Sequence, residues 1–253
     1  MNYLNIILPV YNEEKRLERG VETTVDYLTR LGWDDCQLTI VDNASVDATQ
    51  EIARQLCEKH SNVSYIRLDE KGVGVAFRQG VAANEAPIVG YMDIDLSTDL
   101  KHLQQARDAF ESDSQIGMVN GSRWAQSSET EGRKWYRSIT SNGLTWLLQT
   151  SLNMRATDAI CGFKFFRRDF VEELIARAGA EENGWFYIIE LLLRAERSNM
   201  EVLELPVHWE DDSSNSKVEV VSLIRNYIQQ INRLRRRFRQ EERSRVTKDY
   251  GHA

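Results

Sequence analysis

Two aspartates that follow an apolar run are the residues of this sequence with the clearest chemistry. The run Val89–Met92 has the composition of a buried strand, and Asp93 and Asp95 come directly after it, two positions apart. Side chains two apart on an extended chain project from the same face, so the two carboxylates can hold one divalent cation. Such a pair commonly binds a nucleotide diphosphate through the cation. The alternative is a solvated strand end that leads into the cap of a helix beginning at Leu100.

Apolar runs and helix-like stretches alternate around these aspartates. We predict strands over Leu4–Val10, Leu38–Val41, Val63–Leu68, Ile88–Met92 and Ile116–Asn120. We predict helices over Glu14–Arg30, Ala48–His60, Val75–Asn84 and Leu100–Ser112. This alternation favours a mainly parallel sheet whose two faces are covered.

The pattern changes after about residue 121. We predict helices over Arg133–Asn153 and Trp185–Arg197, strands over Ala159–Phe166 and Met200–Val207, and a long basic amphipathic helix over Val218–Glu242. Residues 126–132 and 211–216 are polar and typical of loops. We therefore predict one α/β catalytic domain over residues 1–217 and a basic helical tail over residues 218–253.

The net charge of −7 hides an uneven distribution. From Lys217 onward there are ten Lys and Arg residues and four Asp and Glu, a balance of +6, so the preceding residues carry −13. A basic tail on an acidic body predicts contact with something anionic, such as a membrane surface or the body itself. Nucleic acid is disfavoured, because the tail has no recognised motif and the body would repel phosphates.

The cysteines and the apolar runs indicate the compartment. Cys36, Cys57 and Cys161 are odd in number and far apart, which fits a reducing cytosol and argues against a disulfide framework or a zinc site. No apolar run approaches the roughly 18 residues that span a bilayer, and the first residues lack a basic leader. We predict a cytoplasmic protein whose attachment to the cytosolic membrane face, if any, is peripheral.

Polar residues gather at the predicted carboxyl ends of the strands, where open parallel sheets bind ligands. The segments are Tyr11–Glu14, Asp42–Asp47, Lys71–Gly74, Asp93–Asp95 and Gly121–Arg123. Any one of them can be a turn or a cap, as Ser45 and Asp47 would be for the helix from Ala48. Five of them at one edge predict a binding site.

Between about Asn5 and Val218 the sequence resembles the inverting glycosyltransferases of family 2. The resemblance rests on six segments in the right order: ILPVYNEEKRL, VDNASVDAT, GVGVAFRQG, YMDIDLSTD, GSRW and DAICGFKFFRRD. The most similar subgroup is the polyprenyl- and dolichyl-phosphate hexosyltransferases, the phospho-dolichol glucose and mannose synthases. The resemblance implies a GT-A fold, which is an α/β nucleotide-diphospho-sugar transferase-like architecture with a mainly parallel sheet flanked by helices, here followed by the basic amphipathic helix.

The resemblance also assigns residues to the donor and to a metal. The donor-binding positions are Pro9, Tyr11 and Glu13 around the nucleobase and ribose, Asp42 at the base, Arg78 near the donor site, and Asp93 at the metal on the diphosphate. For Arg78 the alternative is a solvated helix surface. Asp93 and Asp95 match the metal-binding DxD motif, which implies Mg²⁺ or Mn²⁺ as a Lewis acid that offsets charge on the departing nucleotide.

Two positions depart from the family pattern. Gly72-Val73-Gly74 stands where relatives commonly carry Gly-Lys-Gly, and the neighbouring Lys71 is a candidate substitute for the missing lysine. Ile188 stands two residues before Glu190, where glucosyl-type enzymes often have an aspartate. The second departure leaves the donor sugar open.

A phosphate acceptor would need positioning more than activation. A phosphate monoester has a second pKa of about 6 and is largely dianionic at neutral pH, so it needs no general base. The planar fork of arginine suits such a group. The resemblance places Arg123, Arg137 and Lys164 at the acceptor phosphate, with Arg167 nearby; for the last three residues a solvated face is the alternative.

Asp158 matches a position discussed as catalytic in the family. With a hydroxyl acceptor it would be the general base, because a hydroxyl must lose its proton. With a phosphate acceptor it would orient a basic residue or contact the sugar. We therefore predict Asp95, Asp158 and Arg123 as the catalytic residues.

The basic tail offers a route to a lipid acceptor. Its apolar stripe, flanked by arginines, consists of Ile224, Tyr227, Ile228, Ile231, Leu234 and Phe238. This pattern suits an interfacial helix on anionic lipid. Packing on the protein's own domain, or on a second subunit in a homo-oligomer, is the alternative.

We hypothesise metal-dependent transfer of a hexose, with inversion, from a nucleotide sugar to polyprenyl phosphate. UDP-glucose is the first donor expected, followed by GDP-mannose or a UDP-N-acetylhexosamine. One alternative is a family 2 enzyme that acts on a soluble or polysaccharide hydroxyl, with Asp158 as base. Another is an inactive scaffold that binds nucleotide sugar without turnover.

Overall fold

The computed structural model describes residues 2–132, 135–210 and 220–250, with the backbone alone for residues 135–141, 220–225 and 245–250. The chain divides into two compact units. The first comprises Met1–Arg133 and Thr157–Asp212, and the second Lys134–Ala156 and Ser213–Ala253. Residues 134–156, which we predicted within the catalytic domain, thus group with the C-terminal helix. The domain boundary at residue 217 stays a prediction.

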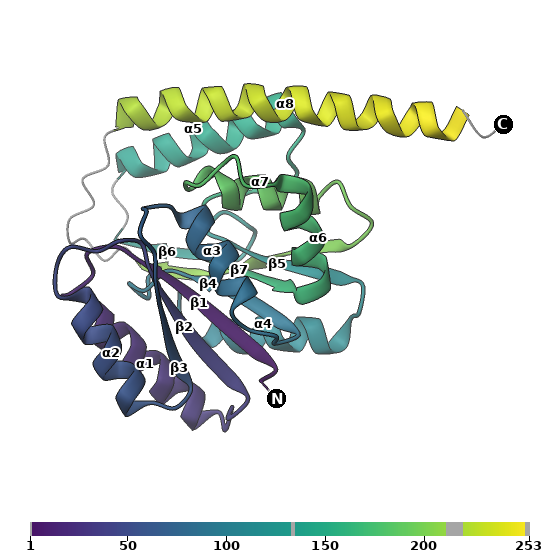
Figure 1. The fold of residues 1–253 in the computed structure, drawn as a ribbon. Helices are drawn as coiled ribbons and strands as arrows, with labels where there is room; N and C mark the ends of the chain where they lie inside the picture. The colour runs from purple at the N-terminus through teal and green to yellow at the C-terminus, as the bar shows by residue number, and fades with distance from the viewer. Residues whose placement is uncertain (1, 133–134, 211–219, 251–253) are drawn as a thin grey trace. The chain divides into compact units, whose positions relative to one another are not determined.

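The first unit is built on a seven-stranded sheet in the order β3-β2-β1-β4-β7-β5-β8 (Figure 1). Its strands are β1 (Leu4–Val10), β2 (Cys36–Asp42), β3 (Val63–Arg67), β4 (Ile88–Met92), β5 (Ile116–Ser122), β7 (Phe163–Arg167) and β8 (Glu201–Pro206). All neighbouring pairs are parallel except those of β7, which runs antiparallel between β4 and β5. The predicted mainly parallel α/β sheet is confirmed.

Helices cover both faces of this sheet, which explains why β1 and β4 are apolar along nearly their whole length. On one face lie α1 (Leu17–Arg30), α2 (Thr49–Lys59) and α4 (Lys101–Ser112), whose buried residues share one core with alternate residues of the strands. The other face carries α3 (Val73–Ala82), α6 (Arg168–Ala178) and α7 (Phe186–Ala195). Each helix turns an apolar stripe inward; in α1 the stripe is Leu17, Val21, Val25 and Leu28.

Three elements of the first unit were not predicted. Helix α6 has buried residues at helical spacing, Phe170, Val171, Leu174 and Ala178, behind a charged start that masked the pattern. Strands β6 (Glu129–Glu131) and β9 (His208–Glu210) form a short parallel pair; β6 lies in a stretch predicted as a loop, and residues 208–210 were not assigned to any element. Strand β7 also begins at Phe163 rather than at the predicted Ala159, because residues 158–162 form a turn.

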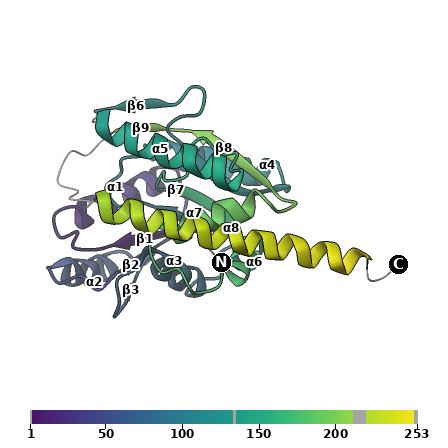
Figure 2. The ribbon, with the colours of Figure 1, turned by 90° about the horizontal axis from the view of Figure 1, so that it is seen from above.

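The second unit contains α5 (Trp135–Leu152) and α8 (Val220–Tyr250), which pack side by side (Figures 1 and 2). Ile231, Leu234 and Phe238 of the predicted apolar stripe are buried, whereas Ile228 is 46% exposed. The side chain of Ile224 lies outside the described residues, as does the loop 211–216. No helix within the described part of the chain is long and apolar enough to cross a membrane.

Candidate active site

The carboxyl ends of the parallel strands place most of the predicted site residues at one edge of the sheet. Asp42 ends β2, Asp93 follows β4, and Arg123 follows β5. Because β7 runs in the opposite direction, its first residues and the turn before it reach the same edge, and this turn contains Asp158. The reversed strand therefore brings Asp158, from a later part of the sequence, to the same edge as Asp42, Asp93 and Arg123.

Asp93 and Asp95 form a like-charged pair at this edge. Tyr91 Oη donates to Asp93 Oδ1 at 3.2 Å, and the Ser97 amide donates to Asp95 Oδ1 at 3.0 Å. Burial, followed by the charge of Asp95, raises the pKa of Asp93 to about 7. A Cβ on Gly162 would overlap the Asp93 carboxylate, so glycine is required beside it.

This pair fits a divalent cation of the kind that keeps open positions. Within the described residues no third His, Cys, Asp or Glu completes a protein-only metal site. Mg²⁺ characteristically takes one or two carboxylates and completes its shell with water and substrate phosphates. A cation would also relieve the repulsion that raises the pKa of Asp93, so the donor set suits a metal held jointly with a diphosphate.

Arg123 and Asp158 form a buried ion pair at the same edge. Arg123 Nε donates to Asp158 Oδ2 at 2.6 Å, and Nη2 donates to Oδ1 at 2.9 Å. The backbone amides of Arg123 and Ile160 also donate to this carboxylate. Burial by itself would raise the pKa of Asp158, but the Arg123 hydrogen bonds and charge outweigh it and hold that pKa low. The guanidinium carbon lies 5.4 Å from the centre of the Trp209 ring.

A second layer of buried polar groups holds the turn before β7 in place. Lys164 Nζ donates to the Cys161 carbonyl at 2.8 Å and to Asn120 Oδ1 at 2.7 Å. Asn120 Nδ2 in turn donates to the Asp158 carbonyl. Glu204 Oε1, from β8, accepts from the Thr157 amide and hydroxyl. Lys164 is 1% exposed and its pKa is lowered by burial, so this predicted acceptor residue lies within the protein and supports the turn.

The two loops after β1 and β2 bind each other. The Asn12 amide donates to Ser45 Oγ at 2.9 Å, and the Val46 amide donates to Asn12 Oδ1 at 2.9 Å. Glu13 makes two hydrogen bonds with Arg16, at 2.7 and 2.8 Å. These contacts set the shape of the loop that we predicted around the nucleobase.

Asp42 is fully buried, and its own chain supplies its partners. Tyr65 Oη and Arg67 Nη1 each donate to Oδ2 at 2.8 Å, and the Ser45 amide donates to Oδ1 at 2.8 Å. These three donors fix Asp42 beneath the loop. Its predicted contact with the base stays a prediction.

Tyr11 and Lys71 stand on the surface of this edge. Lys71 Nζ lies 3.5 Å from the centre of the Tyr11 ring, a cation–π contact, and Tyr11 is 37% exposed. Pro9 lies one residue from the end of β1, beside Val41 of β2. Lys71 therefore lies beside a predicted donor residue.

Arg78 is a structural tie between α3 and the segment before α7. Its Nη1 donates to the Glu182 carbonyl at 3.1 Å, and its Nη2 donates to Asn183 Oδ1 at 2.6 Å. The start of α3 makes the same contact, because the Gly74 amide donates to the Asn183 carbonyl and a Cβ on Gly72 would overlap that carbonyl. The departure from Gly-Lys-Gly keeps both glycines that this close approach requires.

One predicted arginine, Arg167, lies away from this edge of the sheet. Arg167 is paired with Ile88 at the amino end of β4, on the opposite edge, where it donates to the carbonyls of Phe110, Asp113 and Ile116. The side chain of Arg137 lies outside the described residues. Ile188 is buried, and Glu190 forms a buried ion pair with Arg194 one helical turn away.

Sequence reasoning missed Tyr91, Asn120, Gly162 and Glu204. Tyr91 and Asn120 are polar groups inside apolar strands, a pattern that signals a buried hydrogen bond. Glu204 is one of two glutamates in β8 and gave no comparable signal. Gly162 becomes meaningful only when β7 is placed against Asp93.

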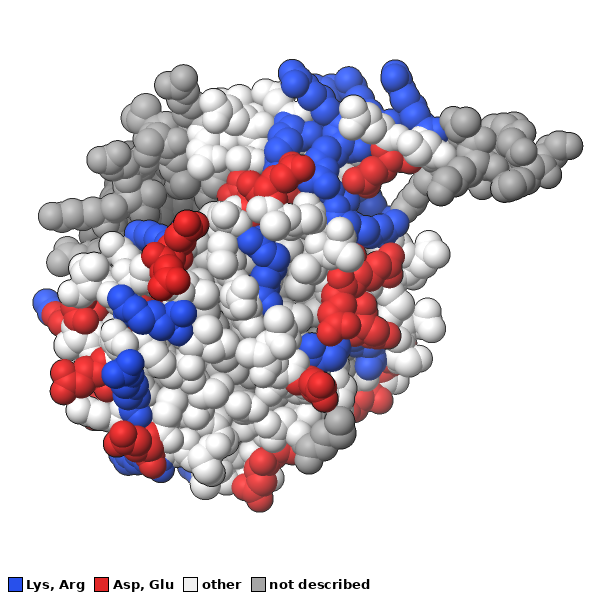
Figure 3. Space-filling model, in the orientation of Figure 1, with Lys and Arg blue, Asp and Glu red and all other residues white. Residues whose placement is uncertain are grey.

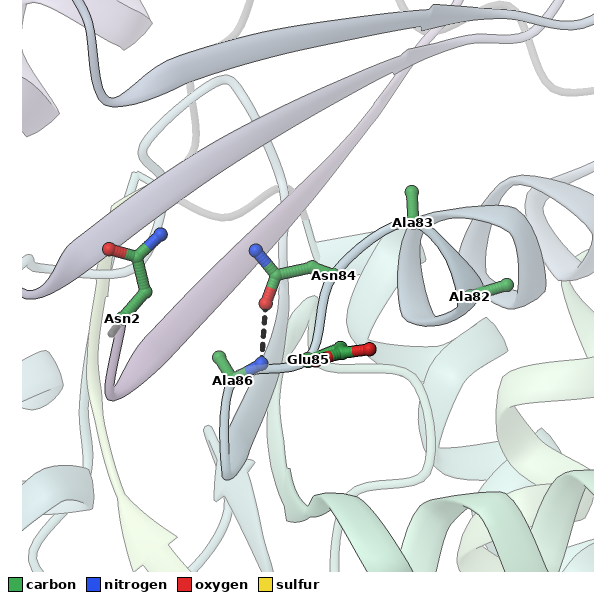
Figure 4. A pocket seen from close by; sticks show the side chains of 6 residues that line it. All are labelled: Asn2, Ala82, Ala83, Asn84, Glu85 and Ala86. Atoms are coloured by element: carbon green, nitrogen blue, oxygen red, sulfur yellow. Dashed lines mark hydrogen bonds between the residues drawn. The ribbon is translucent and has the colours of Figure 1, made fainter.

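A shallow cavity of about 430 Å³ lies at the other edge of the sheet, lined by Asn2 and residues 82–86 (Figure 4). Asn84 points across it to accept from the Ala86 amide, and it also donates to Gln37. Asn2 precedes β1, and residues 82–86 connect the end of α3 to β4. None of the predicted site residues lines it.

Comparison with known proteins places the chain in context. The family model described as Glycosyl transferase family 2 matches residues 5–175. Glycosyltransferase AglD of Haloferax volcanii is 31% identical over 86% of this chain, which spans only 34% of that protein. A dolichyl-phosphate beta-glucosyltransferase of Trichomonas vaginalis is 28% identical over 88% of this chain and 70% of its own length. Glucosyl-3-phosphoglycerate synthase from Mycobacterium tuberculosis, solved with Mn²⁺ and UDP, has the same fold, with a TM-score of 0.63 at 15% identity over 91% of this chain and 77% of its own.

Proposed function

Since the chain belongs to glycosyltransferase family 2, we propose that this hexosyltransferase moves a hexose from a nucleotide sugar to polyprenyl phosphate with inversion. An acceptor phosphate oxygen would bond to the anomeric carbon as the bond from that carbon to the nucleotide diphosphate breaks. Attack from the face opposite the leaving group inverts the anomeric configuration. The similarity to dolichyl-phosphate beta-glucosyltransferases supports a phosphate acceptor.

The observation that carries the proposal is the state of Asp158. A general base must accept a proton from its substrate, and it works best with a pKa near the working pH. Asp158 is fully buried, both its oxygens accept hydrogen bonds from Arg123, and its pKa is held low. This arrangement favours an acceptor that arrives already ionised over a hydroxyl that needs a base.

Arg123 is the residue that we assign to the acceptor phosphate. Asp158 engages Nε and Nη2, and no hydrogen bond between described residues uses Nη1. Nη1 can therefore donate to a phosphate oxygen while the carboxylate holds the guanidinium plane in place. In this scheme Asp158 orients Arg123, which is one of the two roles expected for it with a phosphate acceptor. Arg137 stays a predicted second contact.

On the donor side, Asp93 and Asp95 would hold Mg²⁺ or Mn²⁺ together with the diphosphate. When bound, the cation would supply Lewis-acid stabilisation of the departing nucleotide. The Mycobacterium tuberculosis synthase of the same fold was solved with both Mn²⁺ and UDP. We take UDP-glucose as the first donor to test, because several relatives are beta-glucosyltransferases.

The second unit would meet the membrane that carries the acceptor. In the described part of α8, Arg235, Arg236, Arg239 and Arg243 are exposed, and Figure 3 shows basic side chains gathered over this helix. Ile228 lies on the same flank as Arg235 and Arg239, at positions i, i+7 and i+11. Exposed arginines beside an apolar residue fit an anionic lipid surface.

The test is a lipid-extraction assay with radiolabelled UDP-glucose and GDP-mannose, polyprenyl phosphate and Mn²⁺ or Mg²⁺. We expect a labelled product in the butanol phase that requires polyprenyl phosphate and the metal. Polyprenol in place of polyprenyl phosphate is the matched acceptor, because it offers a hydroxyl on the same chain. Transfer to polyprenol at an equal rate, or to soluble sugars alone, would contradict the phosphate acceptor.

A further inference from the structure

Trp185 is a large exposed aromatic residue beside the proposed donor site. The residue is 48% exposed although it directly precedes α7, a helix whose ten residues are all buried. In the described part of the first unit only Tyr11 and Val46 are other large apolar residues with comparable exposure. Tyr11 is covered on one face by Lys71, and Val46 lies in the loop after β2.

The ring of Trp185 is coupled to the acidic pair through one residue. It packs edge-on against the buried ring of Tyr91, with centroids 6.3 Å apart and an interplanar angle of 89°. The hydroxyl of Tyr91 donates to Asp93 Oδ1. Trp185 thus stands within one side chain of the carboxylate that would hold the metal and the donor diphosphate.

The segment that carries Trp185 is held firmly. Arg78 donates to both Glu182 and Asn183, and the Gly74 amide donates to the Asn183 carbonyl. The Gly184 amide donates to Glu182 Oε1 at 2.8 Å. A ring on so constrained a segment is preorganised, so it loses little conformational entropy when it contacts a ligand.

The surroundings of Trp185 point to a sugar rather than to a prenyl chain. Glu181 and Asn183, the other exposed residues of the segment, are polar, so the ring forms an isolated apolar face with a polar rim. A hexopyranose has a matching shape, because one face presents C–H groups and its edge presents hydroxyls. The hexose is also joined directly to the diphosphate that Asp93 and Asp95 would hold.

We propose that Trp185 stacks on the hexose of the donor and contributes to the choice of sugar. This inference rests on the proposed function, because it requires a nucleotide sugar at Asp93 and Asp95. It assigns Trp185 to the sugar and not to the nucleotide. Removing the ring should therefore lower the affinity for the nucleotide sugar and leave the affinity for the free nucleotide unchanged.

The experiment measures Kd by calorimetry for UDP, UDP-glucose, GDP and GDP-mannose with Mn²⁺, on wild type, Trp185→Ala and Trp185→Phe. We expect Trp185→Ala to raise the Kd of the preferred nucleotide sugar about 3- to 10-fold and to change that of its free nucleotide less than about 2-fold. Trp185→Phe should restore part of the difference, since a smaller ring keeps the apolar face. Trp146→Ala, which removes a 65% exposed tryptophan of α5, is the matched control and should change neither constant.

Four results would overturn the inference. Equal weakening of nucleotide and nucleotide sugar would mean that Trp185 only supports the segment. An unchanged sugar Kd with a raised KM for polyprenyl phosphate would assign the ring to the acceptor. Wild type that binds UDP or GDP but gains nothing from the sugar would reject the stacking alone, whereas wild type that binds none of the four would reject the proposed function as well.

Discussion

Two aspartates at the same edge of the sheet have opposite electrostatic surroundings. Asp158 is fully buried and gripped by Arg123, and its pKa is lowered. Asp93 lies beside another carboxylate, Asp95, and its pKa is raised to about 7. Burial disfavours the charged form of both.

The neighbouring charge therefore sets the direction of the pKa shift: a cation lowers the pKa of Asp158, and a second carboxylate helps to raise that of Asp93. The charge of Asp158 is balanced by the Arg123 side chain, and the hydrogen bonds between them can orient the guanidinium toward a substrate. Among the described residues the Asp93–Asp95 pair has no such cation, so a bound metal ion would be needed to balance its negative charge. The fold therefore places at a single edge the Arg123–Asp158 ion pair, which we propose for the acceptor, and the uncompensated Asp93–Asp95 pair, which we propose for the metal and the donor.

The largest effect should come from removing the built-in cation. Arg123→Leu leaves Asp158 buried without its partner, and we expect a loss of about 3–5 kcal/mol in the free energy of unfolding. Urea denaturation measures it, and Arg123→Leu/Asp158→Leu should recover much of the loss. A loss below about 1 kcal/mol would show that the ion pair is not what holds this edge.

Removing one carboxylate of the other pair should harm activity and spare stability. Asp95→Asn should weaken the proposed metal site, and we expect the transfer rate to fall about 100-fold or more, equivalent to about 2.7 kcal/mol. Its unfolding free energy should stay equal or rise, because the repulsion with Asp93 is removed. Glu85→Gln, at the opposite edge, is the charge-matched control. Parallel losses of stability and rate would make the acidic pair structural.

Crowding Asp93 should give a smaller version of the same effect. In Gly162→Ala the new Cβ overlaps the Asp93 carboxylate and must displace it. We expect the affinity for Mn²⁺ with UDP to fall about 10-fold, together with about 1–3 kcal/mol of stability. Gly143→Ala in α5 meets nothing within 4 Å and should bind as wild type does. Unchanged affinity in Gly162→Ala would remove Asp93 from the metal site.

The smallest effect is the acid dependence of the Asp158 ion pair. Because the folded pKa of Asp158 is lowered, its contribution to stability is full above the unfolded value of about 3.9 and is lost as the pH falls through the folded value. The stability difference between wild type and Asp158→Asn should therefore shrink below about pH 4. Urea denaturation at pH 7, 5, 4 and 3.5 checks this, with the exposed Asp108→Asn as control. A difference that stays constant with pH would contradict the ion-pair account.

Much of the fold could be predicted because burial leaves a local pattern. Leu4–Val10 and Ile88–Met92 were predicted with the bounds that the structure has, since strands covered on both faces are continuous apolar runs. The reversal of β7 could not be predicted, because Phe163–Arg167 is equally apolar read in either direction. Helix α6 was missed although its apolar spacing was present.

The candidate site divides in the same way. Asp93 and Asp95 were recognisable because a spacing of two on a strand end is a local fact. The contact of Arg123 with Asp158 joins residues 35 positions apart, and that of Lys164 with Asn120 joins residues 44 apart. The sequence showed only that Lys164 is basic. Its burial follows from the pairing of β5 with β7, which no local pattern records.

By itself the sequence determined which residue types stand at the ends of the strands, since strand periodicity and turn chemistry act over a few neighbouring residues. Only the tertiary structure decided which of those groups are neutralised by the protein and which are left to a ligand. The physical reason is that a pKa and a hydrogen bond depend on charges and donors within a few ångströms in space. Those partners come from β5, from β7 and from the turn before β7, which are distant in the sequence, so no local pattern records them.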